Sequence, residues 1–179
     1  RISVASAGND HRLGANEAPP AIVSIFVGDE LEAVLKSLAE NTAYEKTGDD
    51  YLDSGVRSLP KLPKDTTDRN RTSPFAFTGN KFEFRMLGSG FSLACPNIIL
   101  NAIVADSLNQ FADELEAVPA AEFDKALQKL LKTKLQAHKR IIFNGNNYAP
   151  EWVDEAASRG LLNLKSTPEA LPHYMDEKN

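Results

Sequence analysis

The stretch Phe75-Ala76-Phe77-Thr78-Gly79-Asn80-Lys81-Phe82-Glu83-Phe84-Arg85 decides how the middle of this chain folds. Its central part, Thr78-Gly79-Asn80-Lys81, is typical of a hairpin turn, because Gly and Asn tolerate positive φ angles. After the turn, charged and apolar residues alternate, and a strand places alternate side chains on opposite faces. The pattern therefore predicts a β-hairpin within residues 73–86.

One face of the second predicted strand carries three charged side chains, Lys81, Glu83 and Arg85. Neighbours on one face of a strand lie roughly 6.6–6.8 Å apart, so the three charges form a row. In such a row the carboxylate suits a hard cation such as Mg²⁺ or Mn²⁺, and the arginine suits a carboxylate or phosphate. An exposed strand whose charges compensate one another would show the same pattern. The residues alone leave both interpretations open.

The segments upstream of the hairpin predict a strand, a helix and a long loop. Residues 21–27 are rich in β-branched side chains and predict a buried strand. Asp29 resembles the first residue of a capping box, and helical spacing of apolar residues predicts a helix over 30–41. Residues 43–69 are polar and predict a loop, which at this length is often functional. A plain surface excursion is the alternative for this loop.

Helices dominate the prediction after the hairpin. Pro96 suits the first turn of a helix, and the broadly apolar residues that follow predict that this helix is well buried. A second helix carries one apolar stripe and a lysine-rich opposite face, with Gly145 as its predicted stop. A short third helix is predicted from Pro150 to Gly160. We expect the residues after Leu164 to be loosely held.

Composition and charge exclude several classes of protein. The chain has 179 residues, of which 42% are hydrophobic and 25% charged, as in folded globular proteins. A net charge of -5 excludes an overall basic surface for nucleic acid or anionic membrane. The longest charge-free stretch, 86–105, is broken by Gly, Pro and Asn, so we expect no membrane span. The single cysteine, Cys95, excludes an internal disulfide and fits a reducing, cytoplasmic compartment.

Two motifs in the chain resemble a known enzyme family. The run from Asn70-Arg71-Thr72-Ser73 through Arg85 resembles the ATP- and metal-binding strand pair of the glutamine synthetase catalytic domain. Upstream, Arg12-Leu13 followed by Glu17-Ala18-Pro19 resembles the glutamate-flap segment of the same family. The spelling of both segments is most similar to the type III glutamine synthetases. The two motifs occur together and in the family's order.

The resemblance implies a role for each matched residue. It makes Glu83 a metal ligand, Lys81 and Arg71 contacts to ATP, and Arg85 and Arg12 ligands of substrate glutamate. Arg71 would also stabilise the transferring phosphoryl group. Glu17 would close over the site and take a proton from ammonium. The implied cofactors are ATP and Mg²⁺ or Mn²⁺, and the implied substrates are glutamate and ammonium.

We therefore expect an α+β fold, with antiparallel strands and a hairpin followed by a mostly helical C-terminal half. The expected division is 1–118 for the later part of a catalytic domain and 119–179 for a helical extension. The chain opens with Arg1 rather than methionine, and we expect a piece of a longer ring-forming ligase that is inactive when isolated. The alternative is a non-catalytic helical assembly module in which the charge row is structural.

Overall fold

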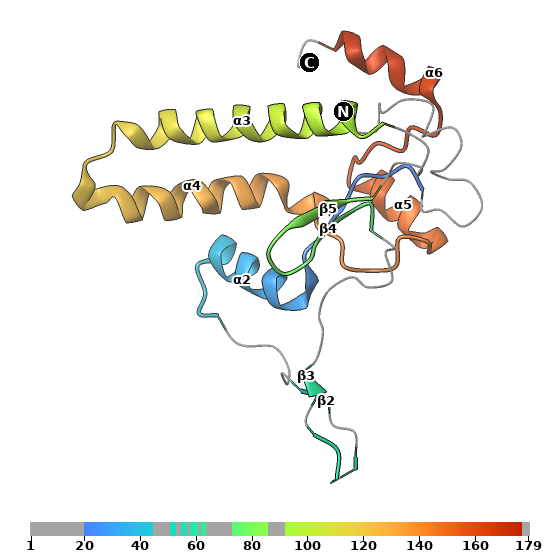
Figure 1. Cartoon of the computed structure of the whole chain (residues 1–179). Coiled ribbons are helices and arrows are strands. Elements are labelled where there is room, and N and C mark those ends of the chain that lie inside the picture. The colour runs from blue at the N-terminus through green and yellow to red at the C-terminus, as the bar shows by residue number, and fades with distance from the viewer. Residues whose placement is uncertain are drawn as a thin grey trace.

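The computed structural model combines a small sheet with helices, and it contains a long helical hairpin (Figure 1). This agrees with the expected α+β class. The structure describes residues 20–44, 51–52, 55–56, 58–60, 62–63, 73–85 and 92–176.

The secondary-structure elements of these described residues follow in chain order. They are β1 (Ile25–Phe26), α2 (Gly28–Glu40), β2 (Tyr51–Leu52), β3 (Leu62–Pro63), β4 (Phe75–Phe77), β5 (Phe82–Phe84), α3 (Ala94–Glu116), η2 (Ala120–Glu122), α4 (Phe123–His138), η3 (Lys139–Ile141), α5 (Pro150–Ser158), α6 (Thr167–Ala170) and η4 (Leu171–Met175).

The predicted hairpin is present and forms part of a three-stranded sheet in the order β1-β4-β5. β4 and β5 are antiparallel, with Phe77 opposite Phe82, and β1 runs parallel to β4. In the turn, the Thr78 amide donates to the Lys81 carbonyl at 2.8 Å, and Gly79 has a φ of +92°. Only glycine adopts that φ at little cost, so the local sequence explains the hairpin.

The C-terminal part of the chain extends this sheet on the other side of β1. Ile25 forms a parallel bridge with Ile142, and the Phe143 amide donates to the Ile25 carbonyl at 3.0 Å. β1 therefore lies between β4 and a segment more than 100 residues downstream in the sequence. The strand that carries the charge row is thus connected, through β4 and β1, to the C-terminal region.

The first turn of α2 is held by a distant side chain rather than by a local cap. The amides of Val27 and Gly28 both donate to Asn144 Oδ1 at 3.0 Å, and Asn144 Nδ2 donates to Glu32. The predicted cap at Asp29 is wrong, because α2 begins at Gly28 and Asp29 lies inside it. Asn144 thus accepts the hydrogen bonds from free amides at the start of the helix, which is the role of a local capping side chain.

A small core joins the predicted strand segment to α5. Ile22, Trp152 and Ala156 are buried together, and the rings of Phe143 and Trp152 stack at 3.6 Å between centroids. Nearby, the Ser24 hydroxyl donates to Asn147 Oδ1 at 3.1 Å, with both side chains buried. The prediction that 21–27 is buried was largely correct, although only Ile25–Phe26 is strand.

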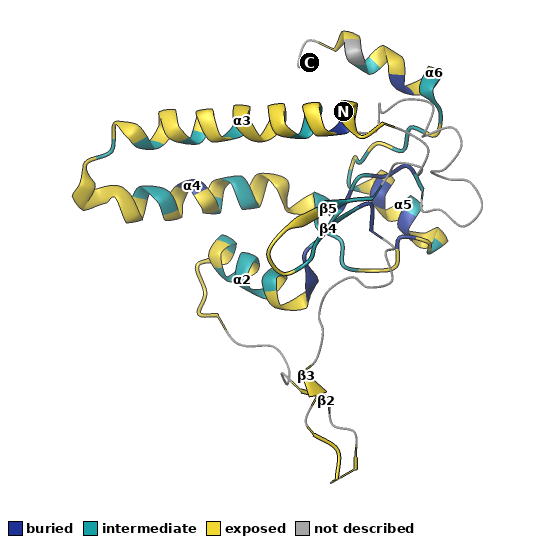
Figure 2. Ribbon diagram, in the orientation of Figure 1, coloured by how far each residue is buried: buried dark blue, intermediate teal, exposed yellow. Residues whose placement is uncertain are grey.

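Burial of α3 differs from the prediction (Figure 2). Pro96 is its single buried residue, whereas Ile98 and Leu108 are 68% and 59% exposed. Within the described residues α4 is the main element that packs along α3, so most of its apolar surface stays uncovered. A broadly apolar helix indicates burial, but a packing partner must be present for burial to occur.

Three other predictions also differ from the structure. α4 ends at His138 and continues as η3, short of the predicted stop at Gly145. The tail expected to be loose contains α6 and η4, with Ala170 fully buried. The expected loop 43–69 contains the antiparallel pair β2 and β3, which lies apart from the sheet and helices (Figure 1). Among the described residues, no helix is both long and apolar enough to cross a membrane.

Candidate functional site

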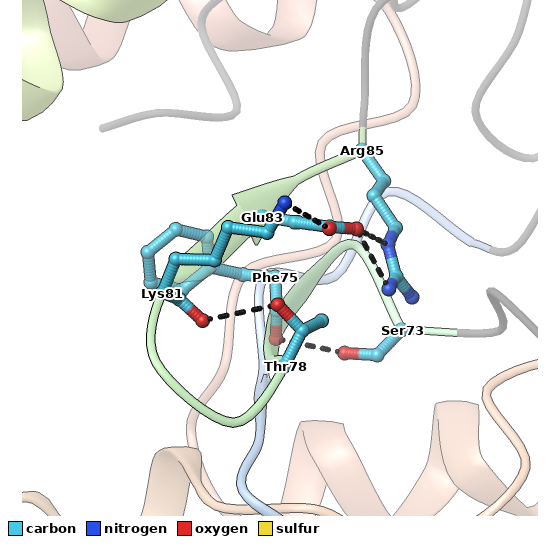
Figure 3. Close-up of polar contacts among 6 residues, drawn as sticks. All are labelled: Ser73, Phe75, Thr78, Lys81, Glu83 and Arg85. Atoms are coloured by element: carbon cyan, nitrogen blue, oxygen red, sulfur yellow. Dashed lines mark hydrogen bonds and ion pairs between the residues drawn. The ribbon is translucent and has the colours of Figure 1, made fainter. Parts of the chain in front are cut away.

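The charge row on β5 forms a connected ion-pair cluster, with Glu83 between the two cations (Figure 3). Lys81 Nζ lies 3.3 Å from Glu83 Oε1. On the other side, Arg85 donates to Glu83 Oε2 from Nε at 3.2 Å and from Nη2 at 3.0 Å. Each carboxylate oxygen therefore faces a different cation, which places all three side chains on one face as the alternation predicted.

Backbone hydrogen bonds and aromatic packing hold the row in place. The Arg85 amide donates to the Pro74 carbonyl at 2.7 Å, which continues the pairing of the hairpin beyond β5. On the opposite face Phe75 stacks on Phe82 at 5.3 Å and contacts Phe84 edge-on at 6.2 Å. Aromatic pairs across neighbouring strands stabilise a sheet, so these rings stabilise the β4–β5 hairpin that carries the charge row.

Solvent access varies along the row. The side chain of Lys81 is 65% exposed, that of Glu83 is 37% exposed, and that of Arg85 is 15% exposed. The Arg85 guanidinium is thus largely sheltered from water, and its Nε and Nη2 both donate to Glu83. An arginine fixed in this way is pre-organised to bind a carboxylate or a phosphate.

The same contacts lower the pKa of Glu83 below its ordinary value of 4.5. The largest cause is the hydrogen bond from Arg85, and the next is the one from Lys81. Both favour the charged carboxylate, so Glu83 is ionised at neutral pH. The row therefore presents two cations and one anion under physiological conditions.

A lowered pKa makes part of the stability depend on pH. The Glu83 ion pairs stabilise the fold above about pH 4.5, and this contribution is lost as the pH falls through the lowered pKa. We expect Glu83→Gln to melt at a slightly lower temperature than the unmodified chain at pH 7, with the gap closing as the pH falls from 4.5 through the lowered pKa. Thermal melts followed by circular dichroism at constant ionic strength measure this gap. A gap that widens as the pH falls would contradict the assigned direction of the pKa shift.

The predicted site residues fall into two groups. Lys81, Glu83 and Arg85 are brought together as described. Arg12, Glu17 and Arg71 lie outside the described residues, so their approach to the row stays a prediction.

A metal site built from described residues alone does not fit the row. Glu83 supplies a single carboxylate, and no group of three Asp, Glu, His or Cys side chains in the described part could hold a metal ion. Mg²⁺ prefers six oxygen ligands, several of them waters, but is usually held by more than one anionic group. Lys81 and Arg85, in contrast, fit anionic groups directly.

Sequence reasoning missed the residues that connect this sheet to the C-terminal region. Asn144 holds the start of α2, and Asn147 receives the buried hydrogen bond from Ser24. The run Asn144-Gly145-Asn146-Asn147 was the available signal, because asparagine side chains readily bond to backbone amides. Nothing in that run indicates a partner more than 100 residues away.

Known proteins match this chain along its whole length. It is 53% identical over 180 residues to the type-3 glutamine synthetase of Dictyostelium discoideum. It is also 46% identical to the glutamine synthetase of Bacteroides fragilis and 49% identical to that of Butyrivibrio fibrisolvens. The family described as glutamine synthetase C-terminal domain matches residues 126–179.

The chain belongs to the glutamine synthetase family. It spans about a quarter of the length of these relatives, 24% of the first and 25% of the others. The resemblance drawn from the two motifs is thereby confirmed. The charge row lies in the part of a glutamine synthetase that precedes the matched C-terminal domain.

Proposed function

We propose that this chain forms part of the site of a glutamine synthetase that ligates ammonia to L-glutamate through γ-glutamyl phosphate, with ATP as phosphoryl donor. One observation carries the proposal. The ordered row of Lys81, Glu83 and Arg85 occurs in a sequence 53% identical over its whole length to a protein named type-3 glutamine synthetase.

The described residues support different ligands for the two cations of the row. Arg85 would bind a carboxylate of glutamate, since its guanidinium is largely sheltered from water and already oriented by Glu83. Lys81 is more exposed than Arg85, and a lysine binds phosphate as a point charge. Glu83 keeps the two cations apart, so that carboxylate and phosphate ligands bind at separate positions.

The matched residues outside the described part complete the proposal. Arg12 would add a second contact to glutamate, and Arg71 would contact ATP and stabilise the charge on the transferring phosphoryl group. Glu17 would accept a proton from ammonium. A bound Mg²⁺ or Mn²⁺ would neutralise phosphate charge, with Glu83 as one ligand and the remaining ligands from other parts of the protein.

The wider organisation is proposed on the same basis. Residues 1–118 would complete the catalytic domain and 119–179 would form a helical extension, in a cytoplasmic homo-oligomeric ring. The alternative is an assembly module without catalytic residues. The exposed apolar surface of α3 and the mutual neutralisation within the row favour this alternative.

Activity of a chimaeric enzyme distinguishes the catalytic role from the assembly-module role. In it, the quarter of the Dictyostelium discoideum type-3 glutamine synthetase that aligns with this chain is replaced by this chain. We expect glutamine formation to be retained within about tenfold, because the replaced segment would keep each catalytic contact. The control is a deletion variant of the Dictyostelium discoideum protein that lacks this aligned quarter. A folded, assembled chimaera that forms no glutamine would contradict the catalytic proposal.

The proposed role of Glu17 predicts a selective defect. In the chimaera, Glu17→Ala should lower glutamine formation relative to phosphate release by at least about tenfold, because the acyl phosphate forms but ammonium keeps its proton. Both rates are measured with ATP and glutamate saturating. If the two rates fall in parallel, the proton-acceptor role is wrong. If Glu17 only supports a turn, the change costs about 1 kcal/mol of stability and leaves the ratio unchanged.

A further inference from the structure

Residues 21–24, which lead into β1, contact the hairpin that carries the charge row. Ala21 is fully buried, and the side chains of Val23 and Phe84 pack against it. Phe84 is the last residue of β5 and directly precedes Arg85. Because a planar peptide bond joins these two residues, a displacement of Phe84 is passed to Arg85.

The alternate side chains of the same segment contact the C-terminal region instead. Ile22 is buried together with Trp152 of α5. The Ser24 hydroxyl donates to Asn147 Oδ1 at 3.1 Å, and both side chains are buried. Successive side chains of an extended segment point to opposite sides. Residues 21–24 therefore connect the C-terminal region on one side to the hairpin on the other.

The hydrogen bond between Ser24 and Asn147 is the directional part of this connection. Apolar packing is non-directional, whereas a buried hydrogen bond fixes the distance and direction between its two atoms. The next residue, Ile25, pairs with Phe75 of β4, and Phe75 lies opposite Phe84 of β5. The position of Ser24 is thus passed to β5 through the sheet as well as through the contact at Ala21.

We propose that Asn147 is a positioning residue for glutamate binding, because its hold on Ser24 sets the place of Arg85. This inference rests on the proposed function, in which Arg85 binds a carboxylate of glutamate. A guanidinium binds a carboxylate through two parallel hydrogen bonds, and small displacements of such a group are costly. Lys81 precedes β5, is 65% exposed and binds as a point charge, so its contact with ATP depends less on Asn147.

Replacing Asn147 by leucine in the chimaera tests the proposal. Leucine is of similar size but accepts no hydrogen bond, so the Ser24 hydroxyl stays buried without its acceptor. We expect the KM for glutamate to rise at least about fivefold and the KM for ATP to change less than about twofold. Initial rates are measured with one substrate varied and the other saturating. A loss of folded enzyme alone would lower the maximal rate and leave both KM values unchanged.

The double variant Ser24→Ala, Asn147→Leu separates positioning from stability. It removes both partners of the hydrogen bond, so the melting temperature should recover most of what Asn147→Leu loses. The KM for glutamate should stay raised, because the remaining apolar contact does not fix a direction. A KM that returns to normal together with the melting temperature would overturn the proposal. An unchanged KM for glutamate in both variants would also overturn it.

Leu130→Ala is the matched control for a general loss of stability. Leu130 is 6% exposed on α4 and belongs to neither of the clusters around Ala21 and Ile22. Its truncation should lower the melting temperature but leave the KM for glutamate within about twofold. If Leu130→Ala raises this KM as much as Asn147→Leu does, the effect is one of stability and the positioning role is wrong.

Arg85→Ala shows which of the two proposals fails. In the chimaera it should raise the KM for glutamate at least about tenfold, because the proposed carboxylate contact is lost. If it does so while the Asn147 variants leave this KM unchanged, the positioning role alone is overturned. If Arg85→Ala leaves the KM unchanged, Arg85 does not bind glutamate, and the positioning role fails together with that part of the proposed function.

Discussion

Replacing Glu83 by glutamine is expected to lower glutamine formation by the chimaera about a hundredfold or more while leaving its assembly intact. The amide keeps the shape of the side chain but removes the negative charge that holds Arg85 and Lys81 at their separate positions. Losing one preorganised electrostatic interaction in the transition state is worth a few kcal/mol, and each 1.36 kcal/mol is about tenfold in rate.

Three measurements give this result its meaning. Initial rates of glutamine formation at saturating ATP, glutamate and divalent metal report the effect on turnover. Sedimentation velocity shows whether assembly is unchanged. Glu151→Gln removes a carboxylate from an exposed position on α5 and should retain near-normal activity. Near-normal activity of Glu83→Gln would show that the row is structural, as the alternative function requires.

Truncating Trp152 to alanine is expected to lower the free energy of unfolding by about 3–5 kcal/mol. The side chain is 1% exposed, stacks on Phe143, and packs with Ile22 and Ala156. Arg159 lies over the same ring, with its guanidinium carbon 5.3 Å from the ring centroid. Removing the indole therefore leaves a cavity at the point where the C-terminal region contacts the 21–27 segment.

Urea unfolding followed by circular dichroism measures this loss in the 179-residue chain. Trp152→Phe is the conservative variant and should lose much less, because the smaller ring still stacks. It also removes the indole Nε1, which is buried with no hydrogen-bond partner in the described part of the chain. Met175→Ala, at an 87% exposed position, should change stability by less than about 0.5 kcal/mol. If Trp152→Ala resembles Met175→Ala, the core at α5 does not hold the fold together.

The features predicted correctly are those that neighbouring residues decide. The hairpin depends on Gly79 in its turn and on the alternation after it, and both effects act within a few residues. The charge row follows from the same alternation, because a strand leaves no other arrangement for Lys81, Glu83 and Arg85. α5 was placed within two residues, since Pro150 starts it and Gly160, with a φ of +70°, follows its end.

The features predicted wrongly depend on contacts between distant residues. The start of α2 is set by Asn144 rather than Asp29, and no local pattern reveals an acceptor that arrives from another part of the chain. α3 was expected to be buried, because its composition reports how apolar it is but not what packs against it.

The sequence by itself determined the hairpin, the order of charges along β5, the positions of the main helices and the family, because short-range geometry and residue identity suffice for each. Only the tertiary structure decided that Glu83 divides its two oxygens between Lys81 and Arg85. It also decided that Ile142 and Asn144 hold β1 and the start of α2. Such pairings depend on which surfaces meet once the chain has collapsed, and the free energy of a contact between distant residues is not encoded in either residue alone.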